Sequence, residues 1–191
     1  MSANDFKLNE DEKPFDKPDA EKPKATRPRD AATLILVRGG REVMMGQRSK
    51  GHVFMPDKWV FPGGRVDPGD ARAKAATELT AATEALLKKG TLSRRPPRAF
   101  ALAATRETLE EAGLRVGSEA GPELDKLHFI ARAITPPYRP RRFDARFFMA
   151  EADRLISLER QADCGELDEI AWFDLEEALK LDLPAVTRFV L

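Results

Sequence analysis

The sequence predicts an α/β fold, an α/β/α sandwich in which a mixed β-sheet lies between helices. β-prone segments precede and follow two neighbouring helical segments, an order typical of such a sandwich. Hydrophobic residues make up 42% of the chain and charged residues 34%, which suits a packed core rather than a fibrous or wholly disordered protein. The length of 191 residues is appropriate for one domain.

The first folded segments predict a hairpin and a short strand. Two β-prone runs, at residues 32–37 and 42–47, flank a Gly-Gly pair, which is typical of a β-hairpin. A further strand at residues 58–61 ends at a Pro-Gly-Gly sequence, residues 62–64. These glycines permit a close backbone approach that a side chain would block. We therefore expect a special loop after this strand.

Two helices follow one another along the chain. Asp70 is a candidate N-cap, and apolar residues then recur at helical spacing, so we expect a helix over residues 71–89. A second helix is expected over residues 98–112, and Gly113 ends it.

The remaining segments predict three strands and two short helices. The strands are expected at residues 128–134, 142–150 and 170–173, and the helices at residues 175–181 and 185–191. The chain closes on an apolar segment. A truncated sequence and a helix that packs on a second subunit both remain open, so a homodimer is an open prediction.

A charged arm precedes the domain. Residues 1–29 mix acidic and basic residues with four prolines, which predicts a disordered arm, and residues 30–191 form the expected domain. The 32 basic and 32 acidic residues of the chain cancel, so we expect no nucleic-acid partner. The single cysteine, Cys164, fits a reducing compartment. No apolar run approaches the ~20 residues that span a bilayer, so we expect a cytoplasmic protein with no membrane partner.

The second helix carries three carboxylates within one turn. Glu107, Glu110 and Glu111 have the spacing i, i+3 and i+4, so they share one face. The negative end of the helix dipole at the Gly113 stop disfavours such anions by roughly 0.3–1 kcal/mol each. Arg106 can offset only part of this repulsion, whereas a hard divalent cation could bind all three carboxylates. A solvated acidic face is the alternative.

Together with the upstream glycines, this helix resembles the signature of the Nudix hydrolase family, G-x5-E-x7-R-E-U-x-E-E-x-G-U, in which U is aliphatic. The matching residues are Gly64, Arg106, Glu107, Glu110, Glu111, Gly113 and Leu114. Thr108 occupies a position that is usually aliphatic. The resemblance implies the Nudix type of α/β/α sandwich.

Two further departures concern the middle of the signature. Asp70 replaces the usual glutamate, and residues 71–105 occupy the place of seven residues. We expect a helical insertion over residues 71–98 that leaves the metal site intact. For Asp70, we favour the role of N-cap of the inserted helix over a role in the metal site.

The layout around the signature resembles the branch of Nudix proteins that includes acyl-coenzyme A diphosphatases. The segments that carry this likeness are residues 47–49, 54–56, 60–64, 135–136 and 140–148. Val53 and Asp57 depart from it, because other coenzyme A enzymes carry arginine and glycine there. The branch implies cleavage of coenzyme A or acyl-coenzyme A to 3′,5′-ADP and (acyl-)4′-phosphopantetheine. ADP-ribose, a dinucleotide or a nucleotide sugar is an alternative substrate, and a non-catalytic nucleotide-binding module is an alternative function.

The resemblance also implies a metal site. Mg²⁺ or Mn²⁺ would be bound by Glu107, Glu110 and Glu111 together with a backbone carbonyl of the glycine loop, assigned to Gly64 with Gly63 as the alternative. Arg106 would hold the carboxylates in position. The resemblance thus implies that Arg106 and Glu107 are both catalytic residues.

Other site residues lie outside the signature. Glu166 is our candidate general base, with Glu169 as its rival, and both are charged residues before a predicted strand. Arg48, Arg142 and Arg146 are candidates for binding the phosphates of a small-molecule diphosphate substrate. Plain surface charge is the alternative for the arginines.

Overall fold

The computed structural model describes residues 26–48, 57–89, 93–137, 139, 141–155 and 167–191. The strands of these residues are β1 (Arg29–Arg38), β2 (Glu42–Arg48), β3 (Trp59–Val60), β4 (Gly63–Arg65), β5 (His128–Ile134), β6 (Phe143–Glu151) and β7 (Leu167–Asp174). The helices are α1 (Ala81–Lys88), α2 (Pro97–Ala112), α3 (Leu175–Ala178) and α4 (Ala185–Val190). Among the described residues, no helix has the length and apolarity needed to cross a bilayer.

The strands form one mixed sheet. Its main path is β3-β2-β1-β6-β5, with β4 paired to β1 and β7 paired to β2. β1 and β6 run parallel, and the other pairs are antiparallel. The parallel pair requires a long crossover, and this crossover contains α1 and α2.

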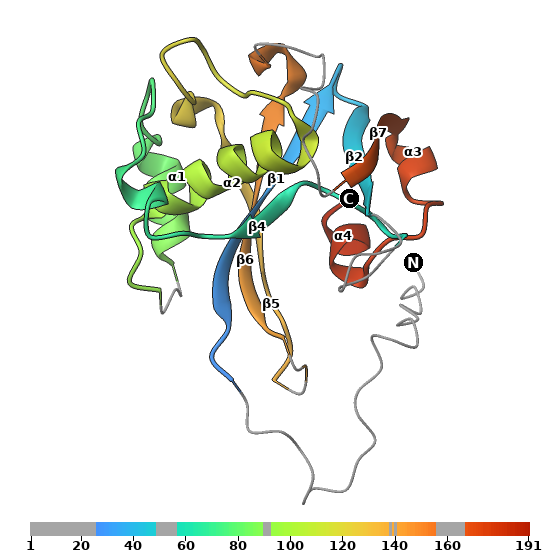
Figure 1. Cartoon of the computed structure of the whole chain (residues 1–191), viewed down its shortest axis with the longest axis horizontal. Coiled ribbons are helices and arrows are strands. Elements are labelled where there is room, and N and C mark those ends of the chain that lie inside the picture. Colours follow the sequence, from blue (N-terminus) through green and yellow to red (C-terminus); the bar gives the residue numbers. More distant parts are fainter. Residues whose placement is uncertain (1–25, 49–56, 90–92, 138, 140, 156–166) are drawn as a thin grey trace, which may run out of the picture.

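Helices cover both faces of the sheet. Leu34 and Leu36 of β1 belong to a buried cluster that includes the apolar residues of α2, whereas Ile35 belongs to a second cluster with Ala178 and Leu183. Figure 1 shows α2 lying across the strands, apart from α3 and α4 at the C-terminal end. The alternation along β1 therefore separates two cores, and the predicted α/β/α sandwich is confirmed.

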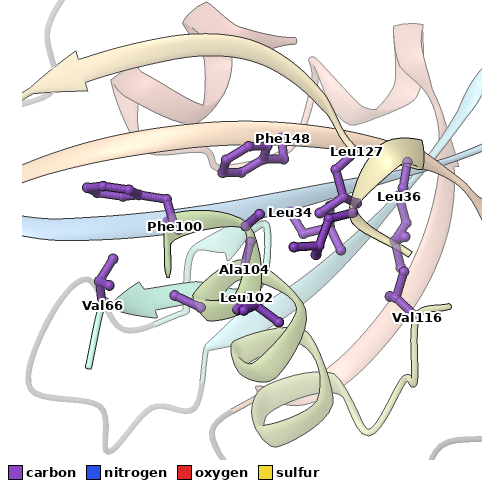
Figure 2. Close-up of a cluster of buried hydrophobic side chains, with 14 of the residues drawn as sticks. Leu34, Leu36, Val66, Phe100, Leu102, Ala104, Val116, Leu127 and Phe148 are labelled. Atoms are coloured by element: carbon purple, nitrogen blue, oxygen red, sulfur yellow. The ribbon is translucent and has the colours of Figure 1, made fainter. Parts of the chain in front are cut away.

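The core under α2 is built from small and large side chains. Figure 2 shows Phe100 and Ala104 of α2 in the same cluster as Leu34 and Phe148 of the sheet. α2 packs closely against β1, and five of its alanines are fully buried: Ala99, Ala101, Ala103, Ala104 and Ala112. The contact with the sheet therefore fixes the position of the whole helix.

The end of α2 confirms the predicted stop. Gly113 adopts the left-handed conformation with φ of 69°, and its N–H bonds to the carbonyl oxygens of Leu109 and Thr108. Thr108, the departure from the signature, is buried, and its hydroxyl donates to the Ala104 carbonyl at 2.8 Å. Its polar group is therefore satisfied within the helix.

The predicted helix at residues 71–89 is wrong in its first half. The chain forms one 3₁₀ turn at Asp70–Arg72, and α1 starts only after Thr80, whose hydroxyl accepts from the Thr83 N–H at 3.2 Å. Between them, the Ala76 N–H donates to the Pro122 carbonyl at 2.8 Å. Bonds to a distant segment thus replace the helical hydrogen bonds that the apolar spacing predicted.

The other elements lie close to their predicted positions. The hairpin of β1 and β2 is confirmed, as are the strands at β5 and β6. The special loop after residue 61 is instead a short strand, β4, which the sequence pattern did not predict. The predicted arm lies mostly outside the described residues, and Arg29, its last residue, already pairs with Phe143 in the sheet.

Candidate active site

β4 places the two glycines directly beneath the end of α2. Gly63 pairs with Thr33, and Gly64 pairs with Ala32 of β1. A Cβ atom on Gly63 would lie 2.6 Å from the Ala32 carbonyl oxygen, and one on Gly64 would lie 2.5 Å from the Glu107 carboxyl carbon. Position 63 therefore requires glycine for strand pairing, whereas Gly64 leaves the space that the Glu107 carboxylate occupies.

Glu111 ties α2 to this strand. Its Oε2 atom accepts a hydrogen bond from the Gly63 N–H at 2.8 Å. The residue is 7% exposed, so the carboxylate is held in a nearly closed environment. A bond from a backbone amide to a carboxylate is stronger than a neutral one, which orients the last turn of α2 over β4.

Arg106 connects the remaining acidic groups. Its Nη1 atom donates to Oε1 of Glu107 at 2.9 Å and to Oε2 of Glu110 at 2.8 Å. Its Nε atom donates to Oδ1 of Asp70 at 2.9 Å, and Nη2 donates to the Arg65 carbonyl at 2.9 Å. Chiefly through the hydrogen bond to Asp70, these groups raise the pKa of Arg106 above its ordinary value. The guanidinium therefore stays charged and holds two glutamates of the face.

Asp70 has a different local role from the predicted one. It is 3% exposed, and its Oδ2 atom accepts from the Asp67 N–H at 2.7 Å and from Arg106 at 3.2 Å. The prediction that Asp70 caps a helix over residues 71–89 is wrong, because its carboxylate is bound to Asp67 and Arg106. Sequence reasoning missed the pairing with Arg106, although the acidic position of the Nudix signature was a usable signal.

The carboxylates of α2 supply oxygen donors suited to a hard cation. Glu107 and Glu110 share one nitrogen of Arg106, and the Glu110 side chain is 55% exposed. Within the described part of the chain, no three histidine, cysteine or acidic side chains converge as a group that could hold a metal ion. The donors fit Mg²⁺ or Mn²⁺ in kind, since both prefer oxygen ligands. The predicted metal set of Glu107, Glu110, Glu111 and Gly64 thus stays a prediction.

Of the predicted substrate-binding arginines, Arg48 is the last residue of β2, and Arg142 immediately precedes β6. Arg48 is partly buried at the end of β2, where its N–H bonds to the Lys58 carbonyl at 3.0 Å. Arg142 donates to the Thr26 and Thr135 carbonyls at 2.6 and 3.0 Å. These contacts let Arg142 hold the chain that leads into β1, and they give no support for a role in binding phosphate.

Arg146 is buried inside the fold. Its side chain is 1% exposed, and its Nη1 atom lies 2.9 Å from Asp144 Oδ1 and 3.4 Å from Asp30 Oδ1. Its guanidinium carbon lies 4.1 Å from the centre of the Phe100 ring. Burial lowers the pKa of Arg146. The structure therefore gives Arg146 a place in the core under α2 and no support for the predicted contact with substrate.

The candidate general base lies outside the described residues. Glu166 falls in the segment 156–166, as does Cys164. Its rival, Glu169, is exposed on β7 opposite Gln47 of β2.

Comparison with known proteins supports one family. No family model matches the chain. A curated Caenorhabditis elegans protein named as a nudix hydrolase, nudix hydrolase 7, is 28% identical over 158 residues, which is 79% of this chain and 53% of the relative. The chain thus spans about half the length of this curated relative.

Solved structures share the architecture. A NUDIX hydrolase from Alicyclobacillus acidocaldarius matches with a TM-score of 0.64 and 26% identity, over 85% of this chain and 89% of that one. A MutT NUDIX hydrolase from Burkholderia pseudomallei matches with a TM-score of 0.57 and 19% identity, over 86% and 96%. The NUDIX domain of Shewanella oneidensis NrtR, solved with ADP-ribose, gives a TM-score of 0.51 at 12% identity, over 85% and 82%. The fold is therefore the Nudix sandwich, and the comparisons support the Nudix hydrolase family.

Proposed function

We propose that this chain is a metal-dependent Nudix pyrophosphohydrolase that cleaves the diphosphate of coenzyme A or acyl-coenzyme A. One observation carries the proposal: a single turn of α2 holds Glu107 and Glu111 against the glycines of β4, and Arg106 on the same turn binds Glu107 and Glu110. This arrangement joins both halves of the Nudix signature across the insertion.

The carboxylates answer a specific chemical problem. A diphosphate repels hydroxide through its own negative charge, so a catalyst must neutralise the phosphates and activate a water. Glu107, Glu110 and Glu111 would hold Mg²⁺ or Mn²⁺ with the Gly64 carbonyl, and the bound cation would supply both effects. The residues of the chain keep the donors in place. Arg106 binds Glu107 and Glu110, and the Gly63 amide binds Glu111.

A base is also needed to take the proton of the attacking water. We assign this role to Glu166, with Glu169 as the alternative. Replacing each in turn with glutamine separates them, because removal of the true base should lower the rate most strongly at low pH, where hydroxide is scarce.

The substrate rests on the likeness to acyl-coenzyme A diphosphatases, carried chiefly by residues 47–64 and 135–148. ADP-ribose, a dinucleotide or a nucleotide sugar is the second candidate, since all share a diphosphate. The Shewanella domain solved with ADP-ribose is similar to this chain in fold alone, so it does not favour one substrate over another. A non-catalytic nucleotide-binding module is the remaining alternative, which the intact acidic turn disfavours.

Product analysis tests the proposal directly. The chain is incubated with Mg²⁺ or Mn²⁺ and, separately, coenzyme A, an acyl-coenzyme A, ADP-ribose and a nucleotide sugar. We expect release of 3′,5′-ADP that a chelator abolishes and that Glu111→Gln lowers by roughly 100-fold or more. Glu119→Gln, which changes a glutamate that is 84% exposed in its side chain, is the matched control and should keep full activity.

The outcomes separate the alternatives. Cleavage of another substrate with the same dependence on Glu111 and metal keeps the mechanism and rejects coenzyme A. Ligand-induced stabilisation with no product from any substrate rejects the enzyme and favours a binding module. Melting temperatures of both variants show whether a loss of activity reflects unfolding.

A further inference from the structure

A polar cavity lies at the opposite end of α2 from the carboxylates. Its volume is about 280 Å³, near the lower end of the range of roughly 300–1,000 Å³ found for ligand pockets. Five of its eleven lining residues are arginines: Arg27, Arg29, Arg65, Arg95 and Arg132. Two are aspartates, Asp30 and Asp144. The lining is therefore basic, although the whole chain has no net charge.

Segments far apart in the sequence build this cavity. Arg29 begins β1, Arg65 ends β4, and Arg132 lies on β5. Ser93 and Arg95 come from the insertion, just before α2. Figure 1 shows this end of β1 beside β5 and β6, below α2. The insertion thus completes the basic lining.

The aspartates are already engaged. Asp144 accepts from Nε and Nη2 of Arg132, both at 2.7 Å, and lies 2.9 Å from Arg146. Asp30 accepts from the Ser93 hydroxyl at 2.7 Å and lies 3.4 Å from Arg146 and 3.6 Å from Arg95. Because buried Arg146 shares both carboxylates from behind the lining, less of their charge is available to offset the arginines of the cavity.

Two arginines of the lining retain their binding capacity. Among the described residues, the side chains of Arg29 and Arg65 form no hydrogen bond or ion pair. The Arg95 side chain makes only a long contact, 3.6 Å to Asp30, within the described part of the chain. A guanidinium presents paired N–H donors that match the oxygens of a phosphate group. We propose that this cavity binds a phosphate group, at a site separate from the acidic turn of α2.

The two sites are neighbours. The start of α2 at Pro97 lies ten residues, about 15 Å, from Glu107 along the helix. Arg65 bridges this separation, because it lines the cavity while its carbonyl accepts from Arg106 at 2.9 Å. The phosphate group could belong to a separate ligand or to the distal end of the substrate. The second source rests on the proposed function, whereas binding itself does not.

Binding of inorganic pyrophosphate by calorimetry tests the site. The titration is done in chelator, so that no metal holds pyrophosphate on Glu107, Glu110 or Glu111, and at constant ionic strength. We expect saturable binding that Arg29→Gln and Arg65→Gln each weaken by roughly tenfold, the effect of losing a charged hydrogen bond. Arg72→Gln is the matched control, because Arg72 is exposed, has no side-chain partner among the described residues and lies outside the cavity.

Absence of saturable binding, or equal affinities in wild type, Arg29→Gln, Arg65→Gln and Arg72→Gln, overturns the proposal. Measuring the melting temperature of each variant checks that it is folded.

Kinetics then distinguish the two sources of phosphate. If the group belongs to the substrate, Arg65→Gln raises KM for coenzyme A but not for dephospho-coenzyme A, which lacks the 3′-phosphate, and pyrophosphate competes with coenzyme A in metal-free binding. If it belongs to a separate ligand, pyrophosphate and coenzyme A bind together. Both outcomes support the phosphate site, and a chain that binds pyrophosphate without cleaving any diphosphate rejects the proposed function alone.

Discussion

Arg106 of α2 and Arg146 of β6 both have acidic partners, but they differ in exposure to solvent. Arg106 pairs with Asp70, Glu107 and Glu110, and its side chain is 26% exposed. Arg146 pairs with Asp30 and Asp144 and is 1% exposed. The hydrogen bond to Asp70 raises the pKa of Arg106, whereas burial lowers that of Arg146.

The difference shows that partners alone do not define a functional arginine. Around Arg146, the guanidinium is closed between two aspartates and the Phe100 ring, so the group serves the fold. Around Arg106, the buried partner Asp70 anchors the guanidinium, while the Glu110 side chain stays more than half exposed to solvent. We therefore expect the solvent-exposed acidic partners of Arg106, and not the enclosed partners of Arg146, to be available for catalysis.

The largest expected effect is on stability at the buried network. Arg146→Ala leaves Asp30 and Asp144 without their shared partner and should lower the free energy of unfolding by about 3–5 kcal/mol. Denaturant unfolding measures this loss. Arg115→Ala, at an exposed arginine whose ion pair spans 3.8 Å, should change it by less than about 0.5 kcal/mol. Unchanged stability with a raised KM would instead restore Arg146 as a substrate contact.

Replacing Arg106 with alanine should affect catalysis more than folding. Arg106→Ala frees Glu107 and Glu110 and should lower kcat/KM by roughly 10–100-fold, as expected when a group that orients metal ligands is lost. Steady-state kinetics together with unfolding measures both effects. Arg106→Lys should restore little activity, because one ammonium cannot reach Asp70 and both glutamates as the guanidinium does. If Arg106→Ala lowers the free energy of unfolding as much as Arg146→Ala does, then Arg106 also serves mainly the fold.

The two glycines of β4 should have different roles, Gly63 in stability and Gly64 in activity. Gly63→Ala places a Cβ 2.5–2.7 Å from atoms of Thr33 and Ala32, and should lower the free energy of unfolding by about 1–3 kcal/mol. At Gly64→Ala the atoms nearest to the new Cβ all belong to the Glu107 carboxylate, a side-chain end that can shift more easily than backbone, so activity should fall while stability changes less. Parallel assays of kcat and unfolding on both variants measure the split. Equal losses of stability would show that Gly64 serves only the fold.

The smallest effect is expected at Asp125, a partly exposed carboxylate that is not among the acidic partners described for Arg106 and Arg146. The Thr77 hydroxyl donates to Asp125, and this bond lowers the pKa of Asp125. The bond therefore stabilises the fold above the ordinary pKa of aspartate, and this contribution is lost as the pH falls through the lowered pKa. Thr77→Val should raise the pKa of Asp125 toward its ordinary value in an NMR titration. No change would mean that the neighbouring Lys126 alone sets it.

Sequence reasoning predicted the parts of the site that lie within one helical turn. The spacing of Glu107, Glu110 and Glu111 follows from the geometry of α2, and the stop at Gly113 is a local signal. It failed for Asp70, because hydrogen bonding to Arg106 joins residues 36 positions apart. Sequence reasoning also predicted too long a helix in the insertion, because the segment before α1 forms hydrogen bonds with residues near Pro122 instead of helical ones.

The sequence by itself determined the acidic turn of α2, the sandwich, and the order of strands and helices apart from β4. Only the tertiary structure decided which charged groups meet. Arg146, predicted to bind phosphate with plain surface charge as the alternative, is buried against Phe100, while Arg29 and Arg65 from separate strands line one cavity. The physical reason is the distance along the chain over which each kind of interaction acts. Hydrogen bonds within a turn depend on neighbours in the chain, whereas ion pairs and burial depend on how β1, β4 and α2 pack.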